Sequence, residues 1–181
     1  AREILDRNGL SDIQIHVVNG KLSDHYNPRN KTINLSREIH DGTSIAALAV
    51  ASHECGHAIQ HLVGYKPLVF RNAILPLCNV GQYLGWIAVF IGLIMGNTSV
   101  AWIGVFLMGG ILLFQIVTLP VEFDASSRAL RILKANYLTT DEYSGAKSML
   151  SAAAFTYVAA MLSTVLSLLR IVLIVIGNDR D

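Results

Sequence analysis

The sequence predicts a mainly α membrane protein, with three transmembrane helices and a small α+β lobe that contains a short β-hairpin. Apolar residues make up 52% of the 181 residues and charged residues only 15%, whereas an ordinary soluble domain has roughly 25% charged residues. Three apolar runs each reach the roughly 20 residues that a membrane-spanning helix requires. The N-terminal 73 residues lack such a run and instead hold the short, polar-punctuated segments of a folded lobe.

The lobe, residues 1–73, is predicted to begin with the tail of an amphipathic helix over 1–9, which Gly9 ends in a left-handed conformation. Residues 13–18, IQIHVV, alternate in polarity and are rich in β-branched side chains, so they predict a strand. NPRN is typical turn sequence between the short extended stretches DHY and TINL. Those two stretches therefore predict the β-hairpin.

A longer helix is predicted over residues 43–63, with Asp41 or Thr43 capping its start and Gly64 ending it. Its apolar part, SIAALAVAS, is rich in alanine and shorter than a bilayer requires. We therefore expect a helix buried in the lobe, not a membrane span.

The three apolar runs cover residues 74–96, 100–121 and 148–177. Only the turn NTS separates the first two, so they predict a tight transmembrane hairpin. The chain is accordingly predicted to have four segments: the lobe (1–73), a transmembrane hairpin (74–121), a polar helical segment (122–147), and a third transmembrane helix with a C-terminal tail (148–181).

The distribution of positive charge predicts the orientation in the membrane. Twelve of the 14 Lys and Arg residues lie in 1–73 and 122–147, and cytoplasmic segments carry such an excess. Both polar segments are therefore predicted to face the cytoplasm, as a site shared between them requires. The net charge of +1, without a basic stripe, argues against a nucleic-acid partner.

The stretch SHECGHAIQH, residues 52–61, contains the pattern His-Glu-x-x-His. On a helix, His53 and His57 lie one turn apart, about 6 Å along the axis, so both imidazoles can bind one tetrahedral Zn²⁺. Glu54 can then reach a water on the metal without binding the metal itself, and act as the general base. The pattern predicts a catalytic zinc site.

A catalytic zinc site also requires a third protein ligand and an open position. His61 lies eight residues after His53, about 12 Å along the same helix, which is too far for the same ion. Glu122 directly follows the second span, on the expected side of the membrane, and is the predicted third ligand. Asp124 is predicted to accept the second ring N–H of a ligand histidine, and is the alternative ligand.

Four stretches, SDHYNP, HECGHAIQ, TLPVEFDASSRAL and AAAFTYVAA, together resemble the YugP-like bacterial membrane zinc peptidases over essentially the whole chain. The order of motif, transmembrane hairpin and glutamate is also similar to gluzincin-type HtpX-like and CAAX-prenyl proteases. The resemblance implies a zincin-like lobe and a further transmembrane helix upstream. It also implies three zinc ligands and one catalytic base: His53, His57 and Glu122, with Glu54.

One position departs from that resemblance. HtpX-like proteins have an aspartate four residues after the glutamate ligand, and this chain has Ser126 there. Asp124, two residues after the glutamate, does not fill the same place. We therefore expect the side chains that support the ligands to be arranged differently.

These observations predict a zinc-dependent metalloendopeptidase that hydrolyses peptides or proteins at the cytoplasmic surface of the bacterial inner membrane. A membrane protein or a second copy of the chain is a candidate partner, besides the lipid bilayer. In gluzincins the strand before the motif helix pairs with extended substrate, and residues 32–36 are predicted to do so. The candidates for an oxyanion or substrate contact are His25, Tyr26, Tyr143 and Tyr157.

Two alternatives remain. A site-2-type intramembrane protease would place the motif within a span and take an aspartate ligand from Leu-Asp-Gly, which this sequence lacks. A non-catalytic adaptor would use zinc only to link the lobe to the hairpin, and would need a fourth protein ligand. Cys55 points about 200° around the helix from His53, away from such a site.

Overall fold

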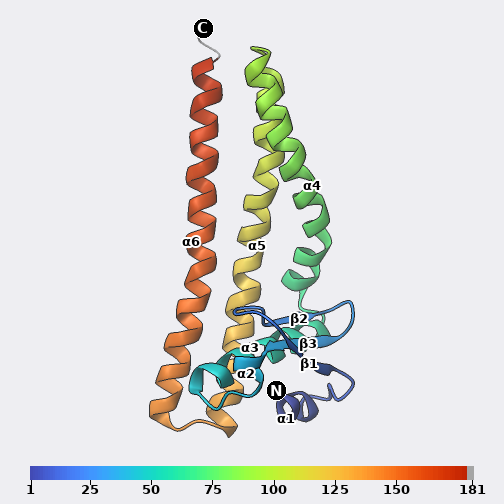
Figure 1. Ribbon diagram of the computed structural model, residues 1–181, viewed down its shortest axis with the longest axis vertical. Coiled ribbons are helices and arrows are strands. Elements are labelled where there is room, and N and C mark those ends of the chain that lie inside the picture. Colours follow the sequence, from blue (N-terminus) through green and yellow to red (C-terminus); the bar gives the residue numbers. More distant parts are fainter. Residues whose placement is uncertain (179–181) are drawn as a thin grey trace. The chain divides into compact units, whose positions relative to one another are not determined.

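The computed structural model of the chain describes residues 1–178 (Figure 1). Asp179, Arg180 and Asp181, which end the predicted C-terminal tail, lie outside the described residues. The elements run in this order: α1 (Arg2–Arg7), β1 (Gln14–Val18), β2 (His25–Asn27), β3 (Thr32–Ser36), α2 (Arg37–His40), α3 (Ile45–Leu62), α4 (Lys66–Ile94), α5 (Thr98–Asn136) and α6 (Thr140–Asn178).

The chain divides into two compact units. One comprises Ala1–Leu68 and Val121–Phe155, and the other comprises Val69–Pro120 and Thr156–Asp181. We call them the polar unit and the apolar unit. The helices α5 and α6 contribute to both units, because each continues without interruption past the unit boundary.

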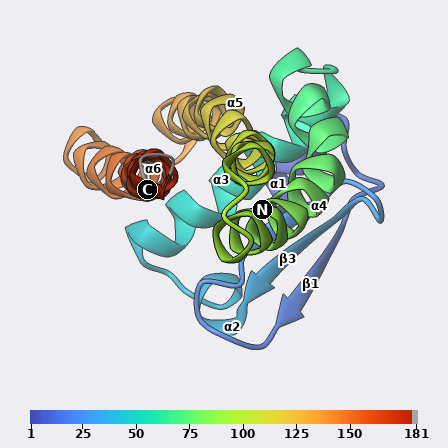
Figure 2. The same ribbon diagram turned by 90° about the horizontal axis from the view of Figure 1, so that it is seen from above.

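The polar unit contains a three-stranded sheet in the order β1-β3-β2. β1 runs parallel to β3, as Figure 2 shows, and β2 pairs with β3 in antiparallel register. The predicted strand and hairpin are both confirmed. The prediction that residues 32–36 offer an edge to a substrate is wrong, because β3 is the central strand and is already paired on both sides. β2 precedes β3 in the chain, and the strand order makes β1 and β2 the two edges of the sheet.

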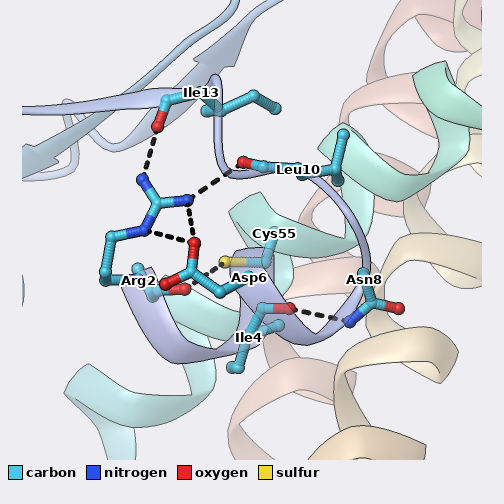
Figure 3. A network of polar contacts seen from close by, with 8 residues as sticks. Arg2, Ile4, Asp6, Asn8, Leu10, Ile13 and Cys55 are labelled. Atoms are coloured by element: carbon cyan, nitrogen blue, oxygen red, sulfur yellow. Dashed lines mark hydrogen bonds and ion pairs between the residues drawn. The ribbon is translucent and has the colours of Figure 1, made fainter.

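Hydrogen bonds from Arg2 connect α1 to the segment that precedes β1 (Figure 3). Its guanidinium donates hydrogen bonds to the carbonyl oxygens of Ile13, at 2.6 Å, and Leu10, at 3.0 Å. It also pairs with Asp6 one turn along the helix. Gly9 ends α1 with φ +72°, as predicted.

The core of the polar unit has two parts, and α3 contributes to both. Where α1 and the sheet pack against α3, the buried side chains are Ile4, Leu5, Leu10, Ile13, Ile33, Leu35, Ala51, Cys55, Ala58 and Ile59. Where α5 and α6 pack against α3, they are Ala49, Ala129, Leu133, Ala146 and Leu150. The helix that carries the His-Glu-x-x-His motif is therefore a buried helix of the polar unit, as its composition predicted.

α3 begins at Ser44, not at the predicted caps Asp41 or Thr43. The Ser44 hydroxyl accepts a hydrogen bond from the backbone N–H of Ala47 at 3.1 Å, in the extended conformation typical of a helix cap. Three neighbouring polar side chains can each cap a helix, so the sequence alone does not choose among them. Gly64 ends the helix with φ +61°, as predicted.

Three helices, α4, α5 and α6, are long and apolar enough to span a membrane. The prediction of a mainly α membrane protein with three spans and a small lobe is confirmed. The predicted boundaries after residues 121 and 147 fall inside α5 and α6, because polarity changes there without a residue that breaks the helix; even Pro120 lies within α5. The division into four segments stays a prediction.

The apolar unit has a small core and many exposed apolar side chains. Its buried cluster consists of Val89, Ala101, Met108, Ile171 and Val175. Large side chains such as Leu77, Ile94 and Phe106 are 74%, 84% and 84% exposed. An apolar surface of this extent is typical of a segment that lipid covers.

Candidate metal centre

The structure brings the two motif histidines of α3 to Glu122 of α5. Nε2 of His53 lies 3.3 Å from Oε2 of Glu122, and Nε2 of His57 lies 3.6 Å from the same oxygen. The three ligand atoms all lie within 4.8 Å of one another. Zinc holds such ligands tetrahedrally at about 2.1 Å, which separates them by about 3.4 Å. The donor set and its spacing therefore fit one zinc ion.

Gly56, inside the motif, allows α5 to approach α3. A Cβ atom at Gly56 would lie 2.6 Å from the backbone carbonyl oxygen of Ala125, so a larger residue would push the two helices apart. Glu122 and Ser126 lie on either side of Ala125 along α5. The missing side chain at Gly56 therefore permits both residues to reach the histidines.

Each motif histidine is held through its second ring nitrogen. Nδ1 of His57 donates to Oε1 of Gln60 at 2.9 Å, and Nδ1 of His53 is hydrogen-bonded to the Ser126 hydroxyl at 3.1 Å. Such bonds fix the ring orientation and the tautomer that leaves Nε2 free for a metal. Both rings consequently direct Nε2 towards Glu122.

Gln60 links His57 to α5. Its side chain is fully buried, and its amide nitrogen donates to the Val121 carbonyl oxygen and to Oδ2 of Asp124, both at 2.8 Å. Asp124 also pairs with Nε of Arg128 at 2.6 Å. The structure thus places Asp124 one hydrogen bond further from the histidines than predicted, since it holds Gln60 and Gln60 holds His57.

The sequence reasoning missed Gln60 and Ser126 as supporting residues. Gln60 follows His57 by three residues and Ser126 follows Glu122 by four, spacings that share one helix face. Ser126 also occupies the position at which HtpX-like proteins have an aspartate, which marks it as a candidate supporting residue. Polar side chains at those spacings from ligand residues could have identified both.

Glu54 is buried beside the ligand group and is only 7% exposed. Burial raises its pKa; the charges of His57 and His53 and a backbone hydrogen bond from Tyr26 oppose the shift without cancelling it. A carboxylate whose pKa is raised from its ordinary value is a better proton acceptor, as general-base catalysis requires.

Tyr26 and His61 form a pair outside the ligand group. The Tyr26 hydroxyl and Nδ1 of His61 are hydrogen-bonded at 2.7 Å, which joins the edge strand β2 to the last turns of α3. His25, the preceding residue of β2, is exposed and donates from Nδ1 to the Ser23 carbonyl oxygen at 2.8 Å. Of these two candidates for a substrate contact, the structure connects Tyr26 to Glu54 and leaves His25 apart.

The other two predicted contacts lie on α6. Tyr143 belongs to the polar unit, where the ammonium of Lys134 lies 5.5 Å from its ring centroid. Tyr143 also lines a cavity together with Ser126. Tyr157 belongs to the apolar unit. The structure therefore brings Tyr143, but not Tyr157, into the unit that holds the ligand group.

Replacing Gln60 by Met is expected to weaken zinc binding about 10- to 100-fold, because His57 loses the partner that orients it. Met has a similar shape, so the packing around this buried position is kept. Competition with a chromophoric chelator measures the affinity. The exposed Gln14, replaced by Met, is the matched control. Unchanged zinc affinity in the Gln60 variant would show that the hydrogen bond does not support the site.

Comparison with known proteins agrees with this site. A family model described as "Putative neutral zinc metallopeptidase" matches residues 1–176. A similar curated protein, "Putative membrane protease YugP" of Bacillus subtilis (strain 168), is 43% identical over 182 residues, which cover 100% of this chain and 80% of that protein. No solved structure matches the chain. The predicted resemblance and the predicted cofactor, zinc, are both confirmed, and the chain belongs to this family of membrane-associated zinc metallopeptidases.

Proposed function

We propose that this protein is a membrane-anchored zinc metalloendopeptidase that hydrolyses peptide bonds of proteins or peptides at the cytoplasmic surface of the bacterial inner membrane. One observation carries the proposal: His53, His57 and Glu122 converge on one ligand position, with the buried Glu54 directly beside them in the chain. Membership of a zinc metallopeptidase family supports the same reaction.

The three protein ligands leave one coordination position of the metal open. Two imidazoles and one carboxylate fill three positions of a tetrahedron, so the fourth is open to water and substrate. Zinc bound there would act as a Lewis acid that polarises the scissile carbonyl and makes water a stronger acid. The Glu54 carboxylate takes a proton from the attacking water as the C–O bond forms. It then delivers that proton to the departing nitrogen as the C–N bond breaks.

The edge strand β2 is the surface that we propose for an extended substrate. Its outer backbone groups are unpaired in the sheet, and a peptide can add to such an edge as a further strand. The backbone of Tyr26, in the middle of β2, is also hydrogen-bonded to the carboxyl group of Glu54. A peptide paired with β2 would therefore run past the proposed base, and we assign the substrate contact to Tyr26.

Two observations favour this proposal over the alternatives. Within the described residues, 1–178, the helices long and apolar enough to span a membrane are α4, α5 and α6, whereas the motif lies on α3. Among residues 1–178, the metal-binding group contains three side chains, and the adaptor alternative needs a fourth. Cys55 does not provide it, because its thiol is directed to the Ala1 carbonyl oxygen, to which it donates, and is not part of the group formed by His53, His57 and Glu122.

The peptidase proposal is tested on the purified protein in detergent or lipid nanodiscs. We expect cleavage of an unstructured protein such as casein, loss of cleavage when a chelator removes zinc, and recovery when zinc is returned. Cleavage that persists after zinc has been removed would contradict the proposal, and the Glu54 variant argued in the Discussion excludes a contaminating protease.

The proposed orientation is tested by cysteine labelling in intact cells. A cysteine replacing Asn97, in the turn between α4 and α5, is expected to react with a membrane-impermeant maleimide. A cysteine replacing Asn30, in the hairpin turn, is expected to react only after the membrane is permeabilised. Both native cysteines, Cys55 and Cys78, are buried and leave a low background. The reverse labelling pattern would overturn the cytoplasmic placement.

A further inference from the structure

A cavity in the polar unit lies between the parts of α5 and α6 that belong to this unit. Its volume is about 210 Å³, below the roughly 300 Å³ of the smallest pockets that bury a whole small molecule. It therefore has the size for one side chain or one chain end. Five of its lining residues are polar: Ser126, Ser127, Arg131, Tyr143 and Ser151.

The cavity borders the ligand group through Ser126. The hydroxyl of this serine is hydrogen-bonded to Nδ1 of His53 at 3.1 Å, and the same residue lines the cavity. A group bound in the cavity would therefore be separated from a zinc ligand by one side chain. A group that is separated from a zinc ligand by only one side chain would belong to a substrate residue close to the scissile bond.

Arg131 determines the charge of the cavity. It is the one charged residue among those that line it. The neighbouring Arg128 pairs with Asp124 at 2.6 Å. Arg131 is exposed and makes no ion pair among residues 1–178, although its charge helps to lower the pKa of Asp124. Its guanidinium is thus available to a ligand.

The chemistry of the lining selects a carboxylate. A guanidinium presents paired N–H donors that match the two oxygens of a carboxylate. Serine and tyrosine hydroxyls can add further hydrogen bonds, and the remaining, apolar wall suits methylene groups. A basic side chain would meet like charge, and a purely apolar one would make no hydrogen bond with the guanidinium of Arg131.

We propose that this cavity is a substrate subsite that binds a carboxylate of the peptide, from an acidic side chain near the scissile bond or from the C-terminus. The inference rests on the peptidase function proposed above and narrows its substrate class. It makes Arg131 a specificity-determining residue, because the guanidinium contacts the substrate and not the reacting atoms.

The test measures peptide binding, not cleavage, on the zinc-loaded Glu54→Gln protein in zwitterionic lipid nanodiscs. Dye-labelled decapeptides carry Glu or Gln at each position in turn, with a free or amidated C-terminus. We expect the carboxylate forms to bind about 10- to 100-fold more tightly than the neutral forms, which is the usual contribution of a hydrogen bond to a charged group. Loss of the preference on amidation assigns the C-terminus, and loss on Glu-to-Gln exchange assigns the side chain.

Arg131→Gln is expected to abolish the preference while neutral peptides bind as before. Lys147→Gln is the matched control, because it removes one exposed positive charge from α6 that does not line the cavity. Zinc content and the melting temperature, both unchanged, show that the variants fold. Arg131→Glu is expected to reverse the preference towards Lys-containing peptides.

Three outcomes would overturn the proposal: no preference for carboxylate in the parent, an equal loss for charged and neutral peptides in Arg131→Gln, or abolition of the preference by phosphatidylglycerol in the nanodisc. The last would assign the cavity to a lipid phosphate. Failure of the peptidase function itself is distinguishable, because it appears as absent cleavage by the parent chain while the binding preference is measured separately.

Discussion

Replacing Glu54 by Gln is expected to reduce peptide cleavage about 10²- to 10⁴-fold, the usual effect of losing a general base. Gln has nearly the same shape as Glu but cannot accept the proton of the attacking water. Because Glu54 is not one of the three residues that converge on the metal position, the variant is expected to keep its zinc. If the protein were only an adaptor, the same change would be harmless.

Casein cleavage by the parent and by Glu54→Gln, each purified in the same detergent and loaded with zinc, measures this effect. Glu38, which is exposed on α2, provides the matched control, and Glu38→Gln should cleave casein at the parent rate. Metal analysis and thermal unfolding confirm that both variants retain zinc and fold. Chelator-sensitive cleavage that continues undiminished in Glu54→Gln would refute the mechanism, even with zinc in place.

The local part of the site could be predicted because helix geometry alone determines it. The spacing of His53 and His57 places both imidazoles on one face of any α-helix, and the caps of α3 lie close to where the polar residues and Gly64 predict them. Glu122 could be predicted as a ligand for a different reason. The distribution of Lys and Arg predicted that its segment lies on the same side of the membrane as the motif. Its convergence with the histidines, 65 and 69 positions away in sequence, is the main addition of the structure.

Spacing along each helix could have suggested Gln60 and Ser126 as supporting residues, but the partner of each across the two helices could not be predicted, because it depends on how closely the helices pack. The approach of Ala125 to Gly56 decides which turn of α5 faces α3. Only at that register do Ser126 reach His53 and Asp124 reach Gln60. A pattern within one helix contains no information on its register against another helix.

The sheet order was missed for a related reason. Sequence identified three extended segments and their turn, but strand order depends on long-range pairing. Because β3 pairs with both β1 and β2, those two strands are the edges of the sheet, and β2 is the edge whose backbone, at Tyr26, is hydrogen-bonded to Glu54. As a result, the proposed substrate surface moved from residues 32–36 to β2. The chemistry of the site was readable locally, whereas the path of the substrate was not.

Removing the Glu122 carboxylate is expected to abolish stable zinc binding. Its side chain is 5% exposed and lies against both imidazoles, so Glu122→Ala leaves a two-histidine site open to water. Loss of a residue that only supports a ligand costs about 10- to 100-fold in affinity, and we expect loss of a ligand to exceed that range. The parent should retain one zinc per chain after gel filtration through a weak chelator, and the variant close to none.

Metal analysis of parent, Glu122→Ala and Asp124→Ala distinguishes the two acidic residues of this turn. Asp124 supports Gln60 and not the metal position, so its variant should bind zinc more weakly than the parent but far better than Glu122→Ala. Glu38→Ala controls for the loss of a carboxylate elsewhere. Thermal unfolding must show that the Glu122 variant is folded, since two partly buried imidazoles lose their charged neighbour. Full zinc stoichiometry and affinity in Glu122→Ala, with loss in Asp124→Ala, would transfer the ligand role to Asp124 and require α5 to present a different face to the histidines.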